Sequence, residues 1–203
     1  MSFSQAVGFT LGAEGGYSND PDDHGGATNF GITQSMFDMA KTAGVIDANI
    51  ANVSDITLRD AQNVYQKYFW DYPGLKANQI NDISPGLAIS LFDFAVNSGP
   101  GTAAKQLQEV LGVTADGVIG PQTIEAIKNY QGNLISDYLA KRREFYSDII
   151  ENDPVQEKYE KGWNNRVDHL DGYIASLTPT PPPVPPARPR CAVDLGCGRG
   201  GPQ

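Results

Sequence analysis

The chain has 203 residues, of which 40% are hydrophobic and 19% are charged, and its formal net charge is −9. This length permits one well-formed hydrophobic core or two small ones. The acidic balance argues against proteins that bind nucleic acid through a basic face, so no nucleic acid partner is expected.

The sequence carries no signal for membrane insertion or export. No window approaches the run of roughly 18 apolar residues that a membrane span requires. Residues 1–5 lack the basic and apolar regions of a signal peptide, so we expect synthesis in the host cytoplasm. The only cysteines are Cys191 and Cys197, so the residues before them hold no disulfide and no cysteine metal ligand.

The first predicted helix begins at a capping box in residues 2–5. Phe3, Val7 and Leu11 follow one face of this helix, and Glu14 continues the same apolar stripe. A carboxylic acid on a core-facing stripe is either paired or has a raised pKa. Because a general acid near neutral pH needs a raised pKa, Glu14 is a candidate catalytic acid.

Residues 15–33 are rich in Gly, Asp and Asn and cannot build a core. We expect loops and turns here, with at most a short β-hairpin within residues 17–33. Long ordered loops beside a helix end commonly hold catalytic groups. The alternative is a helix stop followed by a polar surface loop, and the residue pattern leaves both open.

Helical patterns dominate the next part of the chain. Thr33 and Thr57 are predicted N-caps of two helices, and the second carries an aromatic cluster that includes Trp70. Such a cluster is typical of a core. Trp70, at the helix end, is the candidate exception, because an indole stacks well on a sugar face.

A helix that begins at Ser84-Pro85 is apolar nearly all round, which predicts a place at the centre of the domain. Its polar exceptions, Asp93 and Asn97, lie four residues apart on one face. We expect that face to look into a cleft, although Asn97 could instead only cap the helix end.

The fold class predicted from these patterns is mainly α. Further helices are expected over residues 103–111, through 123–127, and over 134–150 and 163–177. We expect one domain, with halves at residues 1–84 and 85–177 packed together. Residues 178–203 begin with a polyproline stretch and are expected to form a disordered tail.

Glu14, Asp23 and Thr28 could act together on a glycosidic bond. The loop between them is long enough to fold back across the helix end and bring the three side chains around one cleft. One carboxylic acid would protonate the leaving oxygen, and a second would activate water or stabilise positive charge on the sugar. A threonine hydroxyl beside them could orient the water.

Two stretches of the sequence carry a family likeness over roughly residues 2–177. The first comprises Glu14–Pro21, Asp23, Gly25-Gly26, Thr28–Phe30 and Gly31-Ile32. The second comprises Phe92–Gly101, Leu107-Gln108, Asp116-Gly117, Gly120-Pro121, Thr123, Gly162-Trp163 and Asn165–Val167. The first stretch resembles the opening motif of family 108 glycoside hydrolases, which are lysozyme-like N-acetylmuramidases. The second resembles the peptidoglycan-binding segment usually paired with it.

The resemblance implies that Glu14 is the general acid. The arrangement is also similar to the Glu, Asp and Thr of phage lysozymes, which implies that Asp23 and Thr28 position water or support the charged transition state. Thr28 arrives about one residue early for that pattern. Asp20 and Asp22 are alternative second carboxylates, and either could instead bond backbone amides in turns.

No cofactor and no metal are expected. Asp20, Asp22 and His24 alternate before a glycine, faintly like a calcium loop. The twelfth position from Asp20 is Gly31, however, rather than the bidentate glutamate that an EF-hand needs. His24 stands where the family would have proline, a departure that we expect to change loop stiffness more than chemistry.

The resemblance implies a lysozyme-like enzyme that cleaves the β-1,4 bond between N-acetylmuramic acid and N-acetylglucosamine during bacterial lysis by a phage or prophage. Its partner would be the glycan strand of peptidoglycan, held in a groove lined by Tyr17, Trp70, Asp93, Asn97 and Trp163. We expect a monomer that reaches the periplasm and cell wall through a holin or another route. The alternatives are a non-catalytic wall-binding or phage structural module, a lytic transglycosylase, and a secreted antibacterial effector.

Overall fold

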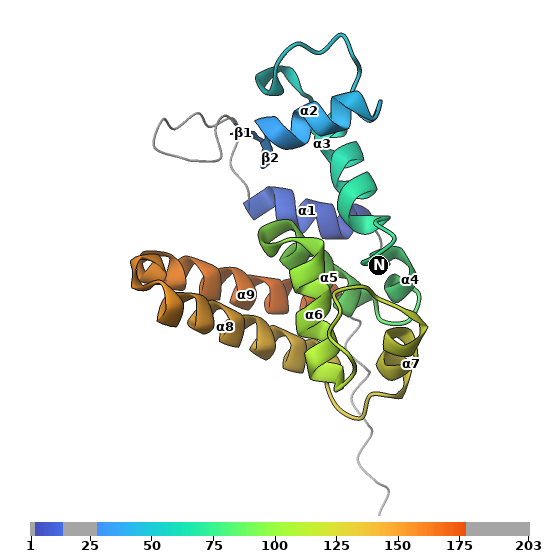
Figure 1. Cartoon of the computed structure of the whole chain (residues 1–203), viewed down its shortest axis with the longest axis vertical. Coiled ribbons are helices and arrows are strands. Elements are labelled where there is room, and N and C mark those ends of the chain that lie inside the picture. The colour runs from blue at the N-terminus through green and yellow to red at the C-terminus, as the bar shows by residue number, and fades with distance from the viewer. Residues whose placement is uncertain (1–2, 14–27, 178–203) are drawn as a thin grey trace, which may run out of the picture.

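The computed structural model describes residues 3–13 and 28–177, most of which are helical (Figure 1). In chain order the elements are α1 (Phe3–Ala13), β1 (Thr28–Asn29), β2 (Ile32–Thr33), α2 (Gln34–Thr42), the 3-10 helix η1 (Val53–Asp55), α3 (Leu58–Tyr65), the π-helix η2 (Gln66–Trp70), α4 (Ala77–Asn81), α5 (Pro85–Ser98), α6 (Pro100–Leu111), α7 (Pro121–Asn129), α8 (Leu134–Asn152), the 3-10 helix η3 (Pro154–Gln156) and α9 (Glu157–Leu177). The predicted mainly α fold with one short hairpin is confirmed. The predicted tail lies outside the described residues.

Helix α5 is the element around which the other helices pack. Every residue from Gly86 to Ala95 is buried, and the helix contacts α1, α4, α6, α8 and α9. Pro85 occupies its first turn, where the fixed φ of proline suits a helix start. The all-round apolar pattern of this segment is thus explained by neighbours on every side, as predicted.

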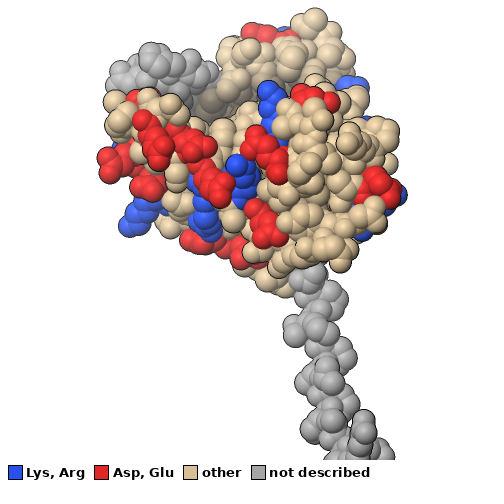
Figure 2. Space-filling view, turned by 60° about the horizontal axis from the view of Figure 1, so that its bottom comes forward, with Lys and Arg blue, Asp and Glu red and all other residues tan. Residues whose placement is uncertain are grey.

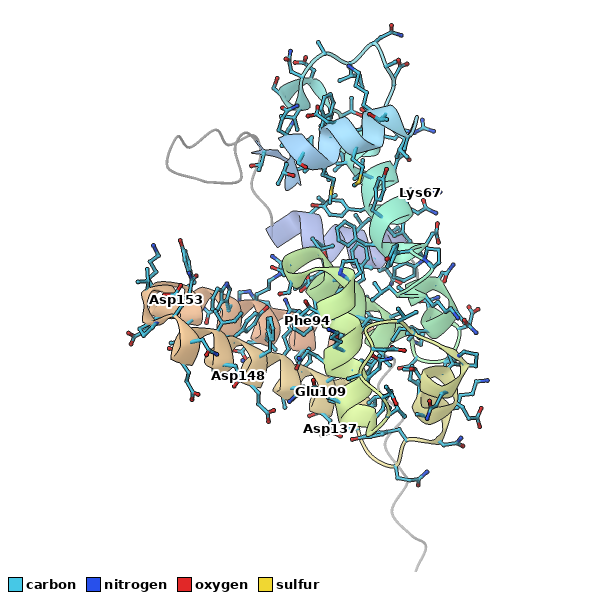
Figure 3. The ribbon with its side chains drawn as sticks, viewed as in Figure 1. Lys67, Phe94, Glu109, Asp137, Asp148 and Asp153 are labelled. Atoms are coloured by element: carbon cyan, nitrogen blue, oxygen red, sulfur yellow. The ribbon has the colours of Figure 1, made fainter. Side chains whose placement is uncertain are left out.

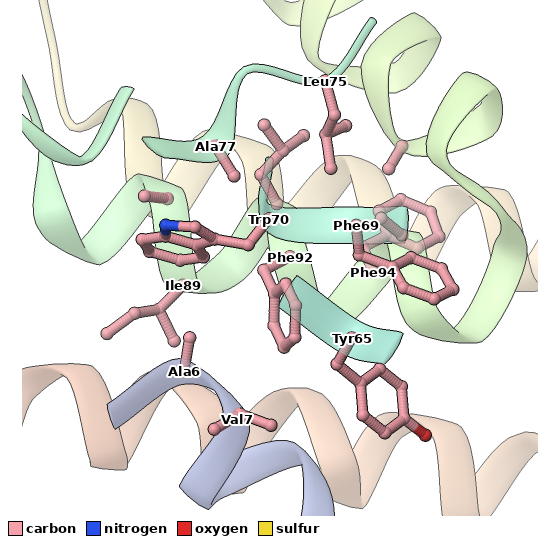
Figure 4. Packing of buried hydrophobic residues seen from close by; sticks show 14 of the residues in the cluster. Ala6, Val7, Tyr65, Phe69, Trp70, Leu75, Ala77, Ile89, Phe92 and Phe94 are labelled. Atoms are coloured by element: carbon pink, nitrogen blue, oxygen red, sulfur yellow. The ribbon is translucent and has the colours of Figure 1, made fainter. Parts of the chain in front are cut away.

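Aromatic residues of α3, η2 and α5 form one cluster in the core (Figure 4), and Phe3 of α1 packs against it. The ring of Phe92 lies edge-on to those of Tyr65, Phe69 and Trp70, with centroids 6.3, 6.4 and 5.8 Å away. Trp70 also lies 5.8 Å from Phe3. Such pairs contribute about 0.5–1.5 kcal/mol each beyond the burial of their area. The cluster therefore ties α1 to the rest of the N-terminal half.

A two-residue hairpin precedes α2, in the register Thr28 opposite Thr33 and Asn29 opposite Ile32. Its central residues, Phe30 and Gly31, both have positive φ, at 52° and 73°. This is the backbone of the tight turn that matches the twist of paired strands. The amide of Asn29 donates to the main-chain oxygens of Val53, Ser54 and Ile56, which fixes the hairpin against η1.

Helices α8 and α9 run side by side as a helical hairpin (Figure 1). Asp153, at its tip in Figure 3, caps the connecting turn by accepting a hydrogen bond from Val155 N. On the surface Arg143 bonds Asp168 at 2.7 Å and Lys141 bonds Glu109 at 3.1 Å. Figure 2 shows acidic and basic side chains interspersed on one face of the molecule.

None of the helices within the described ranges combines the length and apolar character needed to cross a membrane.

Candidate functional site

Six residues singled out in the sequence lie outside the described residues: Glu14, Tyr17, Asp20, Asp22, Asp23 and His24. The structure describes the elements on either side of them. Helix α1 ends at Ala13, immediately before Glu14. Strand β1 begins at Thr28, whose side chain is half-buried. The candidate site is therefore located from the two elements that flank this stretch, α1 before it and β1 after it.

A cleft of about 740 Å³ lies between α1 and α9 and reaches the end of α5. It is lined by Gly8, Phe9, Gly12, Asn97, Gly162, Trp163, Asn165, Arg166, His169 and Tyr173. Gly8 and Gly12 are one turn apart, and a Cβ at either position would have no heavy atom within 4 Å. Gly12 is the second-to-last residue of α1, so the cleft reaches the end of this helix. In the sequence, Glu14 comes directly after that end.

Aromatic rings form much of the α9 side of this cleft. Tyr173 packs against Phe9 of α1 with centroids 5.2 Å apart, and its hydroxyl donates to Gln5 O at 3.0 Å. Trp163 is stacked on Tyr146 of α8, with centroids 4.9 Å apart and planes at 26°. An apolar wall with a few polar groups at fixed positions is typical of a ligand-binding cleft.

A buried ionic cluster lies where α1, α5, α8 and α9 meet. Its centre is Asp93, which is 0% exposed. Arg142 of α8 donates from Nη1 to Asp93 Oδ2 at 2.7 Å, and Arg166 of α9 donates from Nη2 to Oδ1 at 2.8 Å. The hydroxyl of Thr10 on α1 donates to the same Oδ1 at 3.1 Å. We call these four residues the Asp93 cluster.

The electrostatics of the Asp93 cluster favour the carboxylate form. Burial alone would raise the pKa of Asp93. The charges of Arg142 and Arg166 and their hydrogen bonds outweigh burial, so the pKa lies below its ordinary value. Asp93 is therefore an ionised anchor for these helices rather than a proton donor.

Arg142 is buried and bonded through Nη1 and Nε, whereas its Nη2 has no hydrogen-bond partner among the described residues. Its side chain is 0% exposed, and its Nε donates to Tyr146 Oη at 2.8 Å. Its guanidinium lies 4.8 Å from the ring centroid of Phe94, labelled in Figure 3, a distance at which a cation is attracted to a ring face. Because Tyr146 also stacks on Trp163, the cluster is linked to the cleft wall.

Asn97 and Trp163 of the predicted groove residues both line the cleft. Asn97 also donates from Nδ2 to Asp93 O at 2.7 Å, so its amide bonds its own helix at the cleft edge.

Trp70 and Asp93 do not line the cleft, contrary to their expected place in a groove. Trp70 is 5% exposed, because η2 carries it into the aromatic core. Asp93 is turned away from solvent, because two arginines and a threonine surround its carboxylate.

Several residues of the site were not predicted, namely Gly8, Phe9, Thr10, Gly12, Arg142, Arg166, His169 and Tyr173. Arg142 did leave a signal in the sequence. It lies four residues from both Tyr138 and Tyr146 on the apolar side of α8, and a charge on an apolar stripe needs a buried partner. Asp93 on the all-apolar α5 left the matching signal. Nothing in the sequence paired the two.

Within residues 3–13 and 28–177, no three His, Cys, Asp or Glu side chains come together in a way that could hold a metal ion.

Comparisons with known proteins identify the family of the chain. The family model for glycosyl hydrolase 108 matches residues 7–99, and a model described as a predicted peptidoglycan domain matches residues 102–168. The class defined by these matches is a glycoside hydrolase joined to a peptidoglycan-binding segment. The chain belongs to glycosyl hydrolase family 108.

A solved structure supports the same assignment. The structure of Brucella abortus SagA is similar to this chain at 30% sequence identity and a TM-score of 0.70, over 86% of this chain and 94% of that one. No curated protein sequence matches the chain. The two family matches meet at the junction of α5 and α6, and the predicted division after residue 84 stays a prediction.

Proposed function

We propose that the protein is an N-acetylmuramidase that hydrolyses the β-1,4 bond between N-acetylmuramic acid and N-acetylglucosamine, with Glu14 as the proton donor. The observation that carries the proposal is that the last turn of α1 lines the cleft through Gly12, and that Glu14 follows it by two residues. A carboxylic acid at a cleft beside a glycan can protonate the leaving oxygen. Family membership supports the glycosidic bond as the target.

The partners of Glu14 in this proposal come from the segment that ends in the hairpin. Asp23 acts as the second carboxylate, with Asp20 and Asp22 as alternatives, and Thr28 orients water. Anchoring of the hairpin by Asn29 supports a fixed place for Thr28, because the neighbouring amide is bonded to three main-chain oxygens.

Glycan contacts come from the cleft wall in this proposal. Asn97 and His169 supply polar groups, and Trp163 and Tyr173 supply apolar surface. The backbone of Gly8 and Gly12 carries no side chain into the cleft, which leaves this part of the α1 wall open to a glycan.

Loss of turbidity of chloroform-treated Gram-negative cells tests the proposal. Wild type is expected to clear the suspension, and Glu14→Gln is expected to fail while keeping its helical circular dichroism, because the amide cannot donate an acidic proton. The matched control is Glu151→Gln, the same change at an exposed position of α8, which should leave the rate unchanged. Lysis by Glu14→Gln at the wild-type rate would remove the acid assignment.

Mass spectrometry of the released muropeptides separates this function from its rivals. Hydrolysis at the proposed bond leaves reducing N-acetylmuramic acid ends. Anhydro-muramic ends would indicate a lytic transglycosylase instead. A wall-binding or phage structural module would sediment with the wall and release no new ends.

We also propose a role in bacterial cell lysis, with delivery to the wall through a holin or another route, as in the phage endolysins that the sequence resembles. Expression in the cytoplasm of a Gram-negative host is then expected to be tolerated until the inner membrane is permeabilised, when turbidity should fall. Lysis without permeabilisation would contradict this route. Secretion by a bacterium as an antibacterial effector is the competing setting for the same chemistry.

A further inference from the structure

The Asp93 cluster joins the helix that leads to Glu14 to the three helices behind it. We propose that Thr10 is a positioning residue for Glu14, and that Asp93, Arg142 and Arg166 form the fixed base to which Thr10 holds α1. This inference rests on the proposed function, in which Glu14 donates the proton. It gives the second matched segment, residues 102–168, a part in assembling the catalytic half.

The position of Thr10 is what points to this role. Thr10 is 0% exposed, and its hydroxyl donates to a carboxylate that is itself fully buried. A hydrogen bond to a charged acceptor is stronger than one between neutral groups, although the distance of 3.1 Å is long for a hydroxyl donor. Thr10 lies in the last turn of α1, which ends at Ala13, and Glu14 follows Ala13 in the sequence.

The base of the cluster has little freedom to move. Arg166 donates to both oxygens of Asp93, from Nε at 3.3 and 3.2 Å and from Nη2 at 2.8 Å. Arg142 is fixed in turn by Tyr146 Oη and by the ring of Phe94. A hydroxyl that bonds this carboxylate is therefore tied to a rigid point.

Among the described residues, two glycines leave the cleft side of α1 without side chains near its end. Gly8 and Gly12 place no side chain there, and an added Cβ would meet nothing within 4 Å. Phe9 packs on Tyr173, but a ring contact restrains direction less than a bond to a fixed charge does. Loss of the Thr10 hydroxyl should thus let the end of α1 shift. A displacement of about 1 Å at a catalytic group can cost up to about 100-fold in rate.

Two substitutions at Thr10 in the full chain separate the effect of the hydroxyl from the effect of side-chain volume. Thr10→Val keeps the volume and removes the hydroxyl, whereas Thr10→Ser keeps the hydroxyl and removes a methyl group. Initial rates would be measured on solubilised, labelled peptidoglycan fragments over a range of concentrations, together with the melting temperature of each variant. Thr10→Val is expected to lose about 10-fold or more in kcat with KM nearly unchanged, and Thr10→Ser to stay close to wild type.

The result that would overturn the inference is equally specific. A purely structural hydroxyl would lower the melting temperature of Thr10→Val but leave kcat at the wild-type value at temperatures where the variant is folded. An equal loss of kcat in Thr10→Ser would also overturn it, because the hydroxyl would then not be the group that matters.

The variant Glu14→Gln, measured alongside the Thr10 variants, separates a failure of the positioning role from a failure of the proposed function. If Glu14→Gln is inactive and Thr10→Val retains full kcat, the positioning role fails and the proposed function stands. If Glu14→Gln keeps the wild-type rate, the proposed function fails and the positioning role fails with it.

Discussion

Asp93 shows how one buried carboxylate can hold several helices at once. Removing its charge is expected to be costly, because the buried Arg142 and the half-buried Arg166 would then face a neutral amide. Breaking a buried ion pair by changing one partner costs about 3–5 kcal/mol. We predict a loss of this size in the unfolding free energy of Asp93→Asn, measured by urea denaturation.

The matched control for that measurement is Asp148→Asn, the same change at an exposed position of α8. It is expected to stay within about 0.5 kcal/mol of wild type, as surface substitutions usually do. A loss below about 1 kcal/mol in Asp93→Asn would contradict the anchoring role of the carboxylate.

The same residue predicts a dependence of stability on pH. The pKa of Asp93 is lowered in the folded state, so the unfolded chain binds a proton there more readily than the folded one. Its stabilising contribution is therefore complete above the unfolded pKa of about 3.9 and is lost as the pH falls towards the folded pKa. The difference in unfolding free energy between wild type and Asp93→Asn should shrink in acid. A constant difference from pH 7 down to pH of about 2.5 would refute this assignment.

Sequence reasoning marked Asp93 as unusual but predicted the wrong surroundings for it. A polar residue on an apolar helix needs either a cleft or buried partners, and local pattern does not choose between them. The partners, Arg142 and Arg166, are 49 and 73 residues further along the chain. Their pairing depends on how α8 and α9 pack on α5, which a single sequence does not encode in any short motif.

At the scale of elements, one glutamine organises the connection between α6 and α7. Gln108 is 1% exposed. Its Nε2 donates to Asp116 Oδ1 at 2.7 Å and Val118 O at 3.0 Å, and its Oε1 accepts from Gly117 N at 2.8 Å. Both the NH2 group and the oxygen of the Gln108 amide are thus hydrogen-bonded to the turn at residues 116–118. Within this turn, Gly117 has a left-handed backbone conformation, with φ 81°.

We predict that Gln108→Leu lowers the unfolding free energy by about 1–3 kcal/mol, because it leaves the buried N–H of Gly117 without a partner. The measurement is chemical denaturation. Gln106→Leu, the same change at a half-buried position of the same helix, is the control and should cost less than about 1 kcal/mol. Equal losses in both variants would show that helix α6, and not the turn, is sensitive.

The starts of elements were predictable where a single side chain determines them. Thr33 accepts from Met36 N, and Thr57 forms a reciprocal capping box with Asp60, at the helix starts predicted for them. The inward turn of Trp70 was not predictable in this way. It depends on the π-helical geometry of η2 and on Phe3 and Phe92, which reach it from two other helices.

At the scale of the molecule, the two family segments share one ionic cluster. Asp93 and Thr10 belong to residues 7–99, whereas Arg142 and Arg166 belong to residues 102–168. Helices α1 and α5 also pack directly on α9. The hydrolase segment therefore lacks a complete interior without the segment that follows it.

We predict that a fragment of residues 1–99 does not fold. It would expose the faces of α5 that pack on α6, α8 and α9, and it would lack both arginines that bind Asp93. Far-UV circular dichroism should show little helix and no cooperative melting. A chain ending at residue 177, which keeps every described contact, is the control and should melt like the full chain. A cooperative transition in the fragment would show that the segments are separable.

The meeting of the first and last helices has a consequence for how the molecule is made. Tyr173 bonds Gln5 O and packs on Phe9, so α1 contacts residues synthesised some 168 positions later. On a ribosome, α1 emerges first but cannot reach its final place until α9 has also emerged. The nascent chain is consequently without its assembled cleft throughout most of translation. In this fold, the cleft can form only after the last helix, α9, has been synthesised.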